Sequence, residues 1–184
     1  MIYPDDFTKN NTKTFYDIIE SDVDNRQPIH YLFKGICGCG KTYLADIIYK
    51  YIKDNYSVSV NWHTANIFYA KYVKLIMSDD PEDKWLLNYL YGDMPSNSFI
   101  LDDLGSEKDT QASRDFFTLL IDNNYKDIKN GMCRLSIITT NLNDVEITDR
   151  YGKGRAMDRL WENYTVFKFN DYSFRQRDKK IIKG

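Results

Sequence analysis

The segment from Gly35 to Thr42 constrains this chain more than any other, because it reads G-x-x-x-x-G-K-T with every fixed position filled. In such a loop, glycines let backbone N–H groups close around an anion where a Cβ atom would collide. A short apolar run precedes the loop at 29–33, and apolar residues with helical spacing follow it from Leu44 to Ile52. A strand, a glycine-rich loop and a helix in this order are the context in which the motif binds nucleotide phosphates.

Each fixed residue of this loop has an expected role on a triphosphate. Lys41 would reach the β- and γ-phosphates and Thr42 would bind Mg²⁺, so the sequence predicts ATP and Mg²⁺ as cofactors. The helix that begins near Lys41 would direct its partial positive charge at the same oxygens. The residues expected to contact the nucleotide are Gly35, Cys37, Gly38, Cys39, Gly40, Lys41, Thr42 and Tyr43.

The composition indicates one folded domain without a membrane span. The chain has 184 residues, of which 42% are hydrophobic and 15% aromatic, which is enough for a substantial core. No stretch approaches the roughly 18 apolar residues of a membrane helix, so a cytoplasmic protein is expected. Cys37, Cys39 and Cys133 do not form a disulfide framework, and the two histidines lie in or beside apolar runs and are interpreted as structural.

The charge of the chain is unevenly distributed. The net charge is −2, whereas residues 150–184 contain ten Lys or Arg against four Asp or Glu. This basic segment could face phosphates or an acidic neighbour, and a solvated surface with a basic tail is equally compatible with the pattern.

Alternating strand and helix patterns predict an α/β fold. Strands are expected near 29–34, 57–62, 98–102, 135–139 and 165–169, and helices near 14–21, 41–54, 67–76, 81–90, 116–125 and 154–161. Strands that alternate with helices form a parallel sheet covered on both faces. We therefore expect a three-layer sandwich with a central parallel five-stranded sheet, formed by residues 28–184 after a polar extension at 1–27.

Two of the expected strands end in polar side chains, Asp102 with Asp103 on one and Asn141 on another. The carboxyl ends of parallel strands lie beside the crevice that a phosphate-binding loop lines. Asp102 is therefore expected to hold Mg²⁺ directly or through water, and Asp103 to polarise the attacking water, with Glu107 as a second candidate. Asn141 could orient the water or contact the γ-phosphate, or it could cap the next helix.

Taken in order, the motifs resemble a known family. They are G-x-x-x-x-G-K-T at 35–42, L-D-D-L-G-S-E at 101–107, T-T-N-L at 139–142, R-Y-G at 150–152 and R-A-M-D-R-L at 155–160. This series is similar to the DnaC/DnaI-type AAA+ ATPases, the bacterial and phage loaders of replicative helicases, with the IstB transposition ATPases as close relatives. The resemblance covers about residues 28–178 and implies a P-loop NTPase (AAA+) fold without a full helical lid domain.

The resemblance also implies roles for individual residues. Asn141 would be the sensor 1 residue, and Arg159 matches the arginine finger that reaches the ATP of a neighbouring subunit. Arg155 lies one turn earlier on the same helix face and would assist; from the residues alone, both arginines could form an exposed basic face. Arg175 is a weak candidate for sensor 2. The implied catalytic set is Lys41, Asp103, Asn141 and Arg159, with Thr42 and Asp102 as metal ligands.

The family further implies partners, namely a replicative helicase of DnaB type, single-stranded DNA and further subunits that assemble through Arg159 in trans. Single-stranded DNA needs cations and aromatic faces, which 68–74 and 106–114 contain, although core packing of Phe68 and Tyr72 is favoured. Loaders carry an N-terminal domain that grips the helicase, whereas only 1–27 precede the first expected strand. The chain is therefore expected to be an ATPase domain of a longer protein or a short variant.

The residues are also compatible with three functions besides that of a helicase loader in replication initiation. An IstB-like ATPase that regulates transposition would have the same chemistry and a transposase partner. A P-loop nucleotide kinase would need an acceptor site and an Arg-rich lid, which fits the residues less well. A nucleotide switch that does not hydrolyse ATP is compatible with Asp103, where many ATPases have Glu.

Overall fold

The computed structural model describes residues 21, 22, 25, 27–56, 59–91, 98–152 and 155–169, which form five strands and six helices. In chain order these elements are β1 (Ile29–Lys34), α2 (Lys41–Asn55), β2 (Asn61–Thr64), α3 (Ala65–Ile76), α4 (Pro81–Tyr91), β3 (Phe99–Leu104), α5 (Gln111–Lys129), β4 (Leu135–Thr140), α6 (Asp144–Tyr151), α7 (Arg155–Asn163) and β5 (Thr165–Lys168). The helix expected at 14–21 falls outside the described residues except for Ser21, and so does the segment 171–177. None of the described helices is long and apolar enough to cross a membrane.

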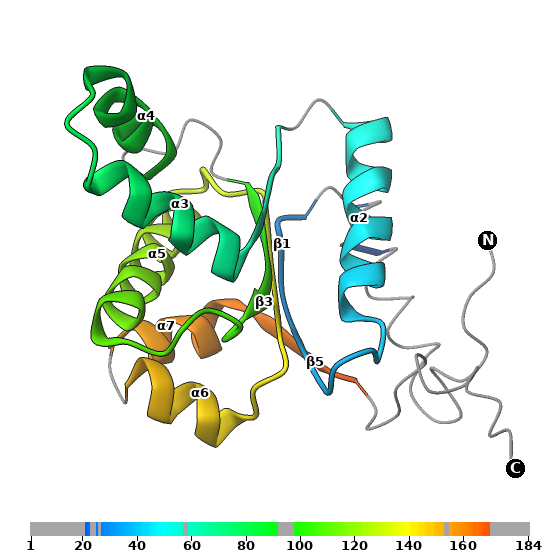
Figure 1. The fold of residues 1–184 in the computed structure, drawn as a ribbon. Coiled ribbons are helices and arrows are strands. Elements are labelled where there is room, and N and C mark those ends of the chain that lie inside the picture. The colour runs from blue at the N-terminus through cyan, green and yellow to red at the C-terminus, as the bar shows by residue number, and fades with distance from the viewer. Residues whose placement is uncertain are drawn as a thin grey trace, which may run out of the picture.

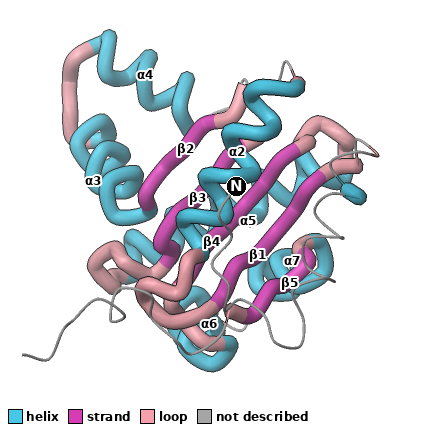
Figure 2. The backbone as a smooth tube through the Cα atoms, turned by 90° about the vertical axis from the view of Figure 1, so that its right-hand side faces the viewer, coloured by secondary structure: helices cyan, strands magenta, loops and turns pink. Residues whose placement is uncertain are grey.

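The five strands form one sheet in the order β2-β3-β4-β1-β5, and every neighbouring pair is parallel (Figure 2). This confirms the expected central parallel five-stranded sheet. Because β1, β4 and β3 are neighbours and run in the same direction, their carboxyl ends meet at one edge of the sheet. The loop after β1 and the polar residues that end β3 and β4 are thereby brought together.

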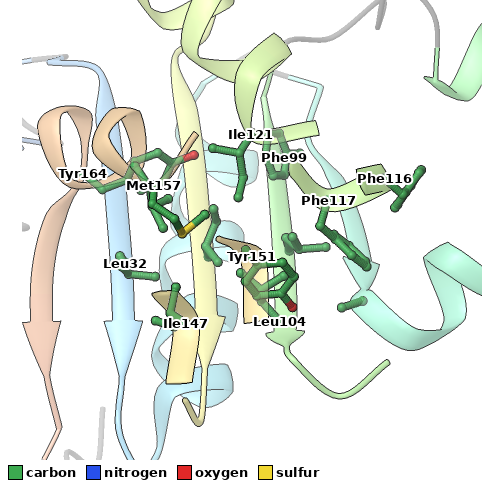
Figure 3. Close-up of a cluster of buried hydrophobic side chains, with 14 of the residues drawn as sticks. Leu32, Phe99, Leu104, Phe116, Phe117, Ile121, Ile147, Tyr151, Met157 and Tyr164 are labelled. Carbon is green, nitrogen blue, oxygen red and sulfur yellow. The ribbon is translucent and has the colours of Figure 1, made fainter. Parts of the chain in front are cut away.

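Helices cover both faces of the sheet, which gives the three layers predicted (Figure 1). The helix α2 packs on one face, over an apolar cluster that includes Tyr31, Phe33, Leu44 and Ile48. The helices α3, α5, α6 and α7 lie on the other face, and their cluster is shown in Figure 3. All six residues of β4 are buried, as expected for a central parallel strand covered on both sides.

Two strands differ from the sequence prediction by more than one residue in their bounds. The alternating pattern placed the second strand at 57–62, but β2 begins at Asn61 and ends at Thr64, because its pairing with β3 runs from Asn61 opposite Phe99 to Thr64 opposite Asp102. The strand expected at 98–102 extends to Leu104, because a bulge carries the ladder past Asp102. Both strands therefore reach farther toward the edge that holds the candidate site.

The helix α6 was not predicted from the sequence. Its N-cap is Asn143, whose side chain accepts hydrogen bonds from the backbone N–H groups of Val145 and Glu146, while the Glu146 carboxylate accepts one from the Asn143 backbone. This reciprocal capping box has a sequence signature, an Asn followed three residues later by Glu. The signal was present, but the helix spans only eight residues and lies between two stronger patterns.

Candidate functional site

The loop between β1 and α2 has the backbone that its glycines predict. Gly38 and Gly40 adopt the left-handed region with φ of 82° and 100°, which residues with a Cβ rarely enter. Gly40 is the N-cap of α2 and brings no side chain to its first turn, which also contains no acidic residue. The first N–H groups of α2 and the positive end of its dipole are therefore left for an anion.

Gly35 is required by close packing at the start of the loop. A Cβ atom built on it would lie 2.8 Å from Phe169 Cβ and 3.0 Å from Cys39 Sγ. The Cys39 side chain is 2% exposed and belongs to the core cluster beneath α2, whereas Cys37 and Tyr43 are exposed. The two cysteines thus differ in solvent exposure, Cys37 being exposed and Cys39 buried, and their expected contacts with a nucleotide remain predictions.

Lys41 is buried and its ammonium group is held against the loop's own atoms. Nζ donates to the carbonyl oxygens of Gly35 at 2.7 Å and Ile36 at 2.9 Å, and to Oδ1 of Asn141 at 2.8 Å. These contacts satisfy the three donors of a lysine. Phosphate oxygens could replace them with stronger, charge-assisted hydrogen bonds, which is the exchange expected when a triphosphate enters the loop.

Thr42 and Asp102, the two residues predicted to hold a metal ion, are hydrogen-bonded to each other. The Thr42 hydroxyl, on the first turn of α2, donates to Asp102 Oδ1, near the end of β3, at 2.9 Å. A hydroxyl and a carboxylate at this separation suit Mg²⁺, which takes few protein oxygens and completes an octahedron with phosphates and water. Within the described part of the chain, no cluster of three or more His, Cys, Asp or Glu could hold a metal ion.

Asn141 links the two halves of the candidate site. Its amide Nδ2 donates to Asp103 Oδ1 at 2.7 Å, while its Oδ1 accepts from Lys41. The N-cap of α6 is Asn143, so the expectation that Asn141 could cap the next helix is wrong. The structure therefore brings Lys41, Asp103 and Asn141 into one hydrogen-bonded unit.

The second candidate for water activation, Glu107, has a different environment. Its side chain is buried, and its carboxylate accepts from Tyr151 Oη at 2.5 Å, from Gly105 N at 3.0 Å and pairs with Arg150 Nη2 at 3.0 Å. Burial, followed by the charge of Glu107, raises the pKa of Tyr151 above its usual value. These contacts fasten the loop after β3 to α6 and favour a structural role for Glu107.

Arg159 lies away from the phosphate-binding loop, on α7. Its guanidinium pairs with Asp122 at 2.6 Å and lies over the ring of Tyr125, both on α5. A residue that acts on a neighbouring subunit's ATP need not approach its own loop, so the role in trans remains a prediction. The Arg155 side chain and Arg175 fall outside the described residues.

The segments proposed for single-stranded DNA are partly occupied by other contacts. Phe68 is buried, stacks on His63 with 4.1 Å between ring centroids and packs against Phe116, as does Tyr72. Core packing is thus what the structure shows for both aromatic rings. In the segment 106–114, the Arg114 guanidinium forms a bidentate ion pair with the Asp109 carboxylate, with N–O distances of 2.7 and 2.9 Å.

One residue of the site was missed in the sequence. Thr139, the residue before the last in β4, is fully buried, and its hydroxyl contacts both Asp102 and the backbone of Asp103. The available signal was two threonines, Thr139 and Thr140, at the end of an otherwise apolar strand. A buried hydroxyl needs a partner, but the sequence does not say which one.

Several solved structures share this fold. The crystal structure of the DnaC helicase loader aligns with a TM-score of 0.71 and 22% identity, covering 89% of this chain and 92% of that chain. Domain III of the Thermotoga maritima replication initiation protein DnaA aligns with a TM-score of 0.65 and 15% identity, covering 92% of this chain and 69% of that chain. DnaA bound to AMPPCP and single-stranded DNA gives a TM-score of 0.61 and 18% identity, covering 89% and 47%.

The likeness is carried by structure, since the sequence matches no protein-family model and no curated protein. At identities of 15 to 22%, what these structures establish is the architecture. The order of the five parallel strands and the loop between β1 and α2 belong to that architecture. The chain therefore has the α/β P-loop AAA+ fold that the DnaC helicase loader and DnaA share.

Proposed function

We propose that this protein is an ATP-binding and ATP-hydrolysing AAA+ module of a replicative helicase loader, active in the cytoplasm at the initiation of DNA replication. One observation carries the enzymatic part of the proposal. Asn141 lies between Lys41 and Asp103, 2.8 and 2.7 Å from their polar atoms, at the edge of the sheet where Thr42 also meets Asp102. Asn141 thus connects the lysine that would bind the γ-phosphate to the carboxylate that would act on water.

The residues divide the chemistry of hydrolysis among them. Lys41 and the first N–H groups of α2 bind and orient the phosphates, and Thr42 and Asp102 hold Mg²⁺. Bound Mg²⁺ would neutralise charge that develops on the transferring phosphoryl group. Asp103 accepts a hydrogen bond from the attacking water and polarises it, while Asn141 orients that water toward phosphorus.

The loader part of the proposal is supported by fold and motif order together. The alignment with the DnaC helicase loader extends over 92% of that chain. The replication initiator DnaA, which has a similar fold, has been solved bound to AMPPCP and single-stranded DNA. We infer corresponding partners here, namely a DnaB-type helicase, single-stranded DNA and further subunits. Arg159 would stabilise the γ-phosphoryl charge in a neighbouring subunit, so that hydrolysis depends on assembly.

The test is steady-state ATP hydrolysis with and without single-stranded DNA, on the wild type and on Lys41→Ala. Lys50→Ala is the matched control, because Lys50 lies on the same helix but is exposed and pairs with Asp46. Turnover that rises with DNA, disappears in Lys41→Ala and persists in Lys50→Ala is expected. Tight ATP binding without turnover in either condition would indicate a nucleotide switch instead.

A nucleotide kinase and an IstB-like ATPase are distinguished from a helicase loader by their products and partners. Phosphoryl transfer from ATP to a nucleotide or nucleoside would identify a kinase and overturn the ATPase proposal. Co-purification of a transposase in place of a replicative helicase would favour the IstB-like function. Affinity purification of the Asp103→Asn variant, which should keep ATP bound without hydrolysing it, is the sharper form of that experiment.

A further inference from the structure

Asp102 and Asp103 are neighbours in β3, yet both side chains contact residues of the candidate site. Consecutive side chains of a regular strand point to opposite faces of the sheet, so regular geometry would aim one carboxylate away from the site. Instead, Asp102 accepts from Thr42 at 2.9 Å, and Asp103 accepts at 2.7 Å from Asn141, which also holds Lys41. The backbone must therefore depart from regular geometry at these two residues.

That departure is a β-bulge with a left-handed residue in it. Leu101 pairs with Ile138 but Leu104 pairs with Thr140, so three steps along β3 match two steps along β4. Asp103 has φ of 63° and is the only residue other than glycine with a positive φ among those described. Bulges re-aim side chains beside active sites, and a left-handed residue with a Cβ persists only where neighbouring contacts hold it.

Thr139 supplies those contacts from the opposite strand. Its Oγ1 accepts a hydrogen bond from the Asp103 backbone N–H at 2.9 Å and donates one to Asp102 Oδ1 at 2.7 Å. A backbone N–H can only donate, so the single hydroxyl proton is directed at the carboxylate. Since Thr42 donates to the same Oδ1, the Asp102 carboxylate is fixed from two sides.

We propose that Thr139 is a positioning residue, which keeps Asp102 in the orientation that binds Mg²⁺ and keeps Asp103 in the bulge that aims it at the attacking water. The proposal rests on the ATPase function proposed above. Thr139 acts through these two residues, because its hydroxyl contacts the Asp102 carboxylate and the Asp103 backbone N–H. Its hydroxyl is the chemical group required, so serine should replace it and valine, which has the same shape, should not.

The neighbouring Thr140 provides a matched control. It is also fully buried in β4, but its hydroxyl donates to the Leu104 carbonyl oxygen at 2.7 Å and accepts from Leu142 N at 3.1 Å. Thr140→Val therefore removes an equally buried hydroxyl that contacts only backbone. Any general cost of a valine at this end of β4 appears in both variants, whereas the loss of carboxylate positioning appears only in Thr139→Val.

The first readout needs no turnover. Calorimetric titration with AMPPCP gives the Kd in EDTA and in Mg²⁺, and their ratio measures how much the metal contributes. Groups that orient metal ligands typically change metal affinity about 10- to 100-fold when removed, so Thr139→Val should reduce this ratio at least about 10-fold. Thr139→Ser and Thr140→Val should keep the wild-type ratio. The kcat should follow the same order, and the KM for ATP in Mg²⁺ should rise only in Thr139→Val, in line with its higher Kd in Mg²⁺.

The second readout is hydrogen exchange of the Asp103 backbone amide, followed by NMR without nucleotide. Thr139→Val should speed this exchange relative to Thr140→Val, and Thr139→Ser should restore protection. Unchanged exchange together with an unchanged Mg²⁺ ratio in Thr139→Val overturns the proposal. Failure of the wild type to bind AMPPCP would contradict the proposed function instead, and the Asp103 amide would then still show whether Thr139 holds the bulge.

Discussion

Arg159 and Asp122 form an ion pair that joins α7 to α5, with 2.6 Å between guanidinium Nη1 and carboxylate Oδ1. The same guanidinium lies 4.7 Å from the centroid of the Tyr125 ring, and the arginine side chain is only 18% exposed. Arg159 is the residue proposed to act on a neighbouring subunit's ATP. Its own chain therefore competes for the group that assembly would use.

This competition predicts opposite effects for the two partners of the pair. Arg159→Ala should abolish DNA-stimulated turnover and lower the free energy of unfolding by about 1 kcal/mol, because it removes an ion pair and a cation–π contact. Asp122→Asn keeps the arginine and weakens the ion pair that holds it within its own chain. Arg159 should then be freer to contact a neighbouring subunit, so DNA-stimulated turnover should reach half its maximum at a lower protein concentration. Hydrolysis rates measured over a range of protein concentrations test both expectations.

Lys129→Ala is the control for that experiment, because Lys129 and Glu162 form a second pair between the same two helices, at 2.8 Å and largely exposed. It should leave the concentration dependence of turnover unchanged. If Asp122→Asn lost as much stimulated turnover as Arg159→Ala, the pair would serve only to hold α7 on α5, and a role in trans would be contradicted.

Asp103 and Glu107, the two carboxylates considered for water activation, should respond differently to removal of their charge. Asp103→Asn should lower kcat about 10²- to 10⁴-fold, the usual range for a general base, with little effect on stability because this residue is only partly buried. Glu107→Gln should lower the free energy of unfolding by roughly 3 kcal/mol, since it leaves Arg150 without its buried partner. Urea unfolding and single-turnover hydrolysis of both variants separate the two roles, and the reverse pattern would exchange the assignments.

The sequence was sufficient for those features of the site that depend on short-range patterns. The fixed residues of the loop from Gly35 to Thr42 and the apolar runs before Asp102 and Asn141 are local signals. The alternation of strands and helices predicts a parallel sheet, and in a parallel sheet the ends of these runs lie at the same edge. This is why Lys41 and Asn141, a hundred residues apart, could be expected to meet, as they do at 2.8 Å.

The features that could not be predicted depend on contacts between distant segments. The bulge at Asp103 exists because β3 and β4 differ by one residue in register, and no pattern within either strand encodes that difference. Likewise, nothing near Arg159 in sequence indicates that Asp122 holds it, or that Lys34 at the end of β1 pairs with Asp144 at the start of α6. Such pairings are decided by packing geometry.

Gly35 should be less tolerant of substitution than any glycine that is constrained by backbone conformation alone. In Gly35→Ala the new methyl group would lie 2.8 Å from Phe169 Cβ and 3.2 Å from its carbonyl oxygen, neither of which a side-chain rotation can move. We expect a loss of roughly 2 kcal/mol or more in the free energy of unfolding, the range for overpacking. Nucleotide affinity should fall as well, because the loop must shift.

Gly131→Ala is the matched control for Gly35→Ala. Gly131 has φ of 69°, but a Cβ there would meet nothing within 4 Å, so only the backbone penalty of about 1 kcal/mol applies. Thermal unfolding with and without AMPPCP measures both quantities. Equal destabilisation of the two variants would show that backbone conformation, and not the contact with Phe169, is what requires glycine at position 35.

His63 should make the stability of the protein depend on pH in the acidic range. Burial, with a smaller contribution from the charge of Lys71, lowers the pKa of His63 to about 4, whereas an unfolded histidine keeps a value near 6.5. The imidazole stacks on Phe68, and its Nε2 has no hydrogen-bond partner among the described residues. The folded state therefore holds this side chain neutral over a range in which the unfolded state protonates it.

The sign of the effect follows from this difference in proton uptake. Between pH 6.5 and 4 the unfolded state binds the proton and the folded state does not, so the free energy of unfolding falls as the pH falls, and the loss levels off below pH 4. At about 1.4 kcal/mol for each pKa unit, the difference of about 2.5 units sets an upper limit of about 3.5 kcal/mol on the loss from His63. Solvent screening of this partly buried ring reduces the expected loss to on the order of 2 to 3 kcal/mol. His63→Phe keeps the stacked ring and removes the titration. Urea unfolding at several pH values should therefore give nearly equal free energies of unfolding for variant and wild type at pH 7. Toward pH 4 the free energy of unfolding of the variant should decline less steeply. Parallel curves would mean that His63 titrates alike in the folded and unfolded states. The slope that remains in the variant includes His30, whose pKa is also lowered by burial.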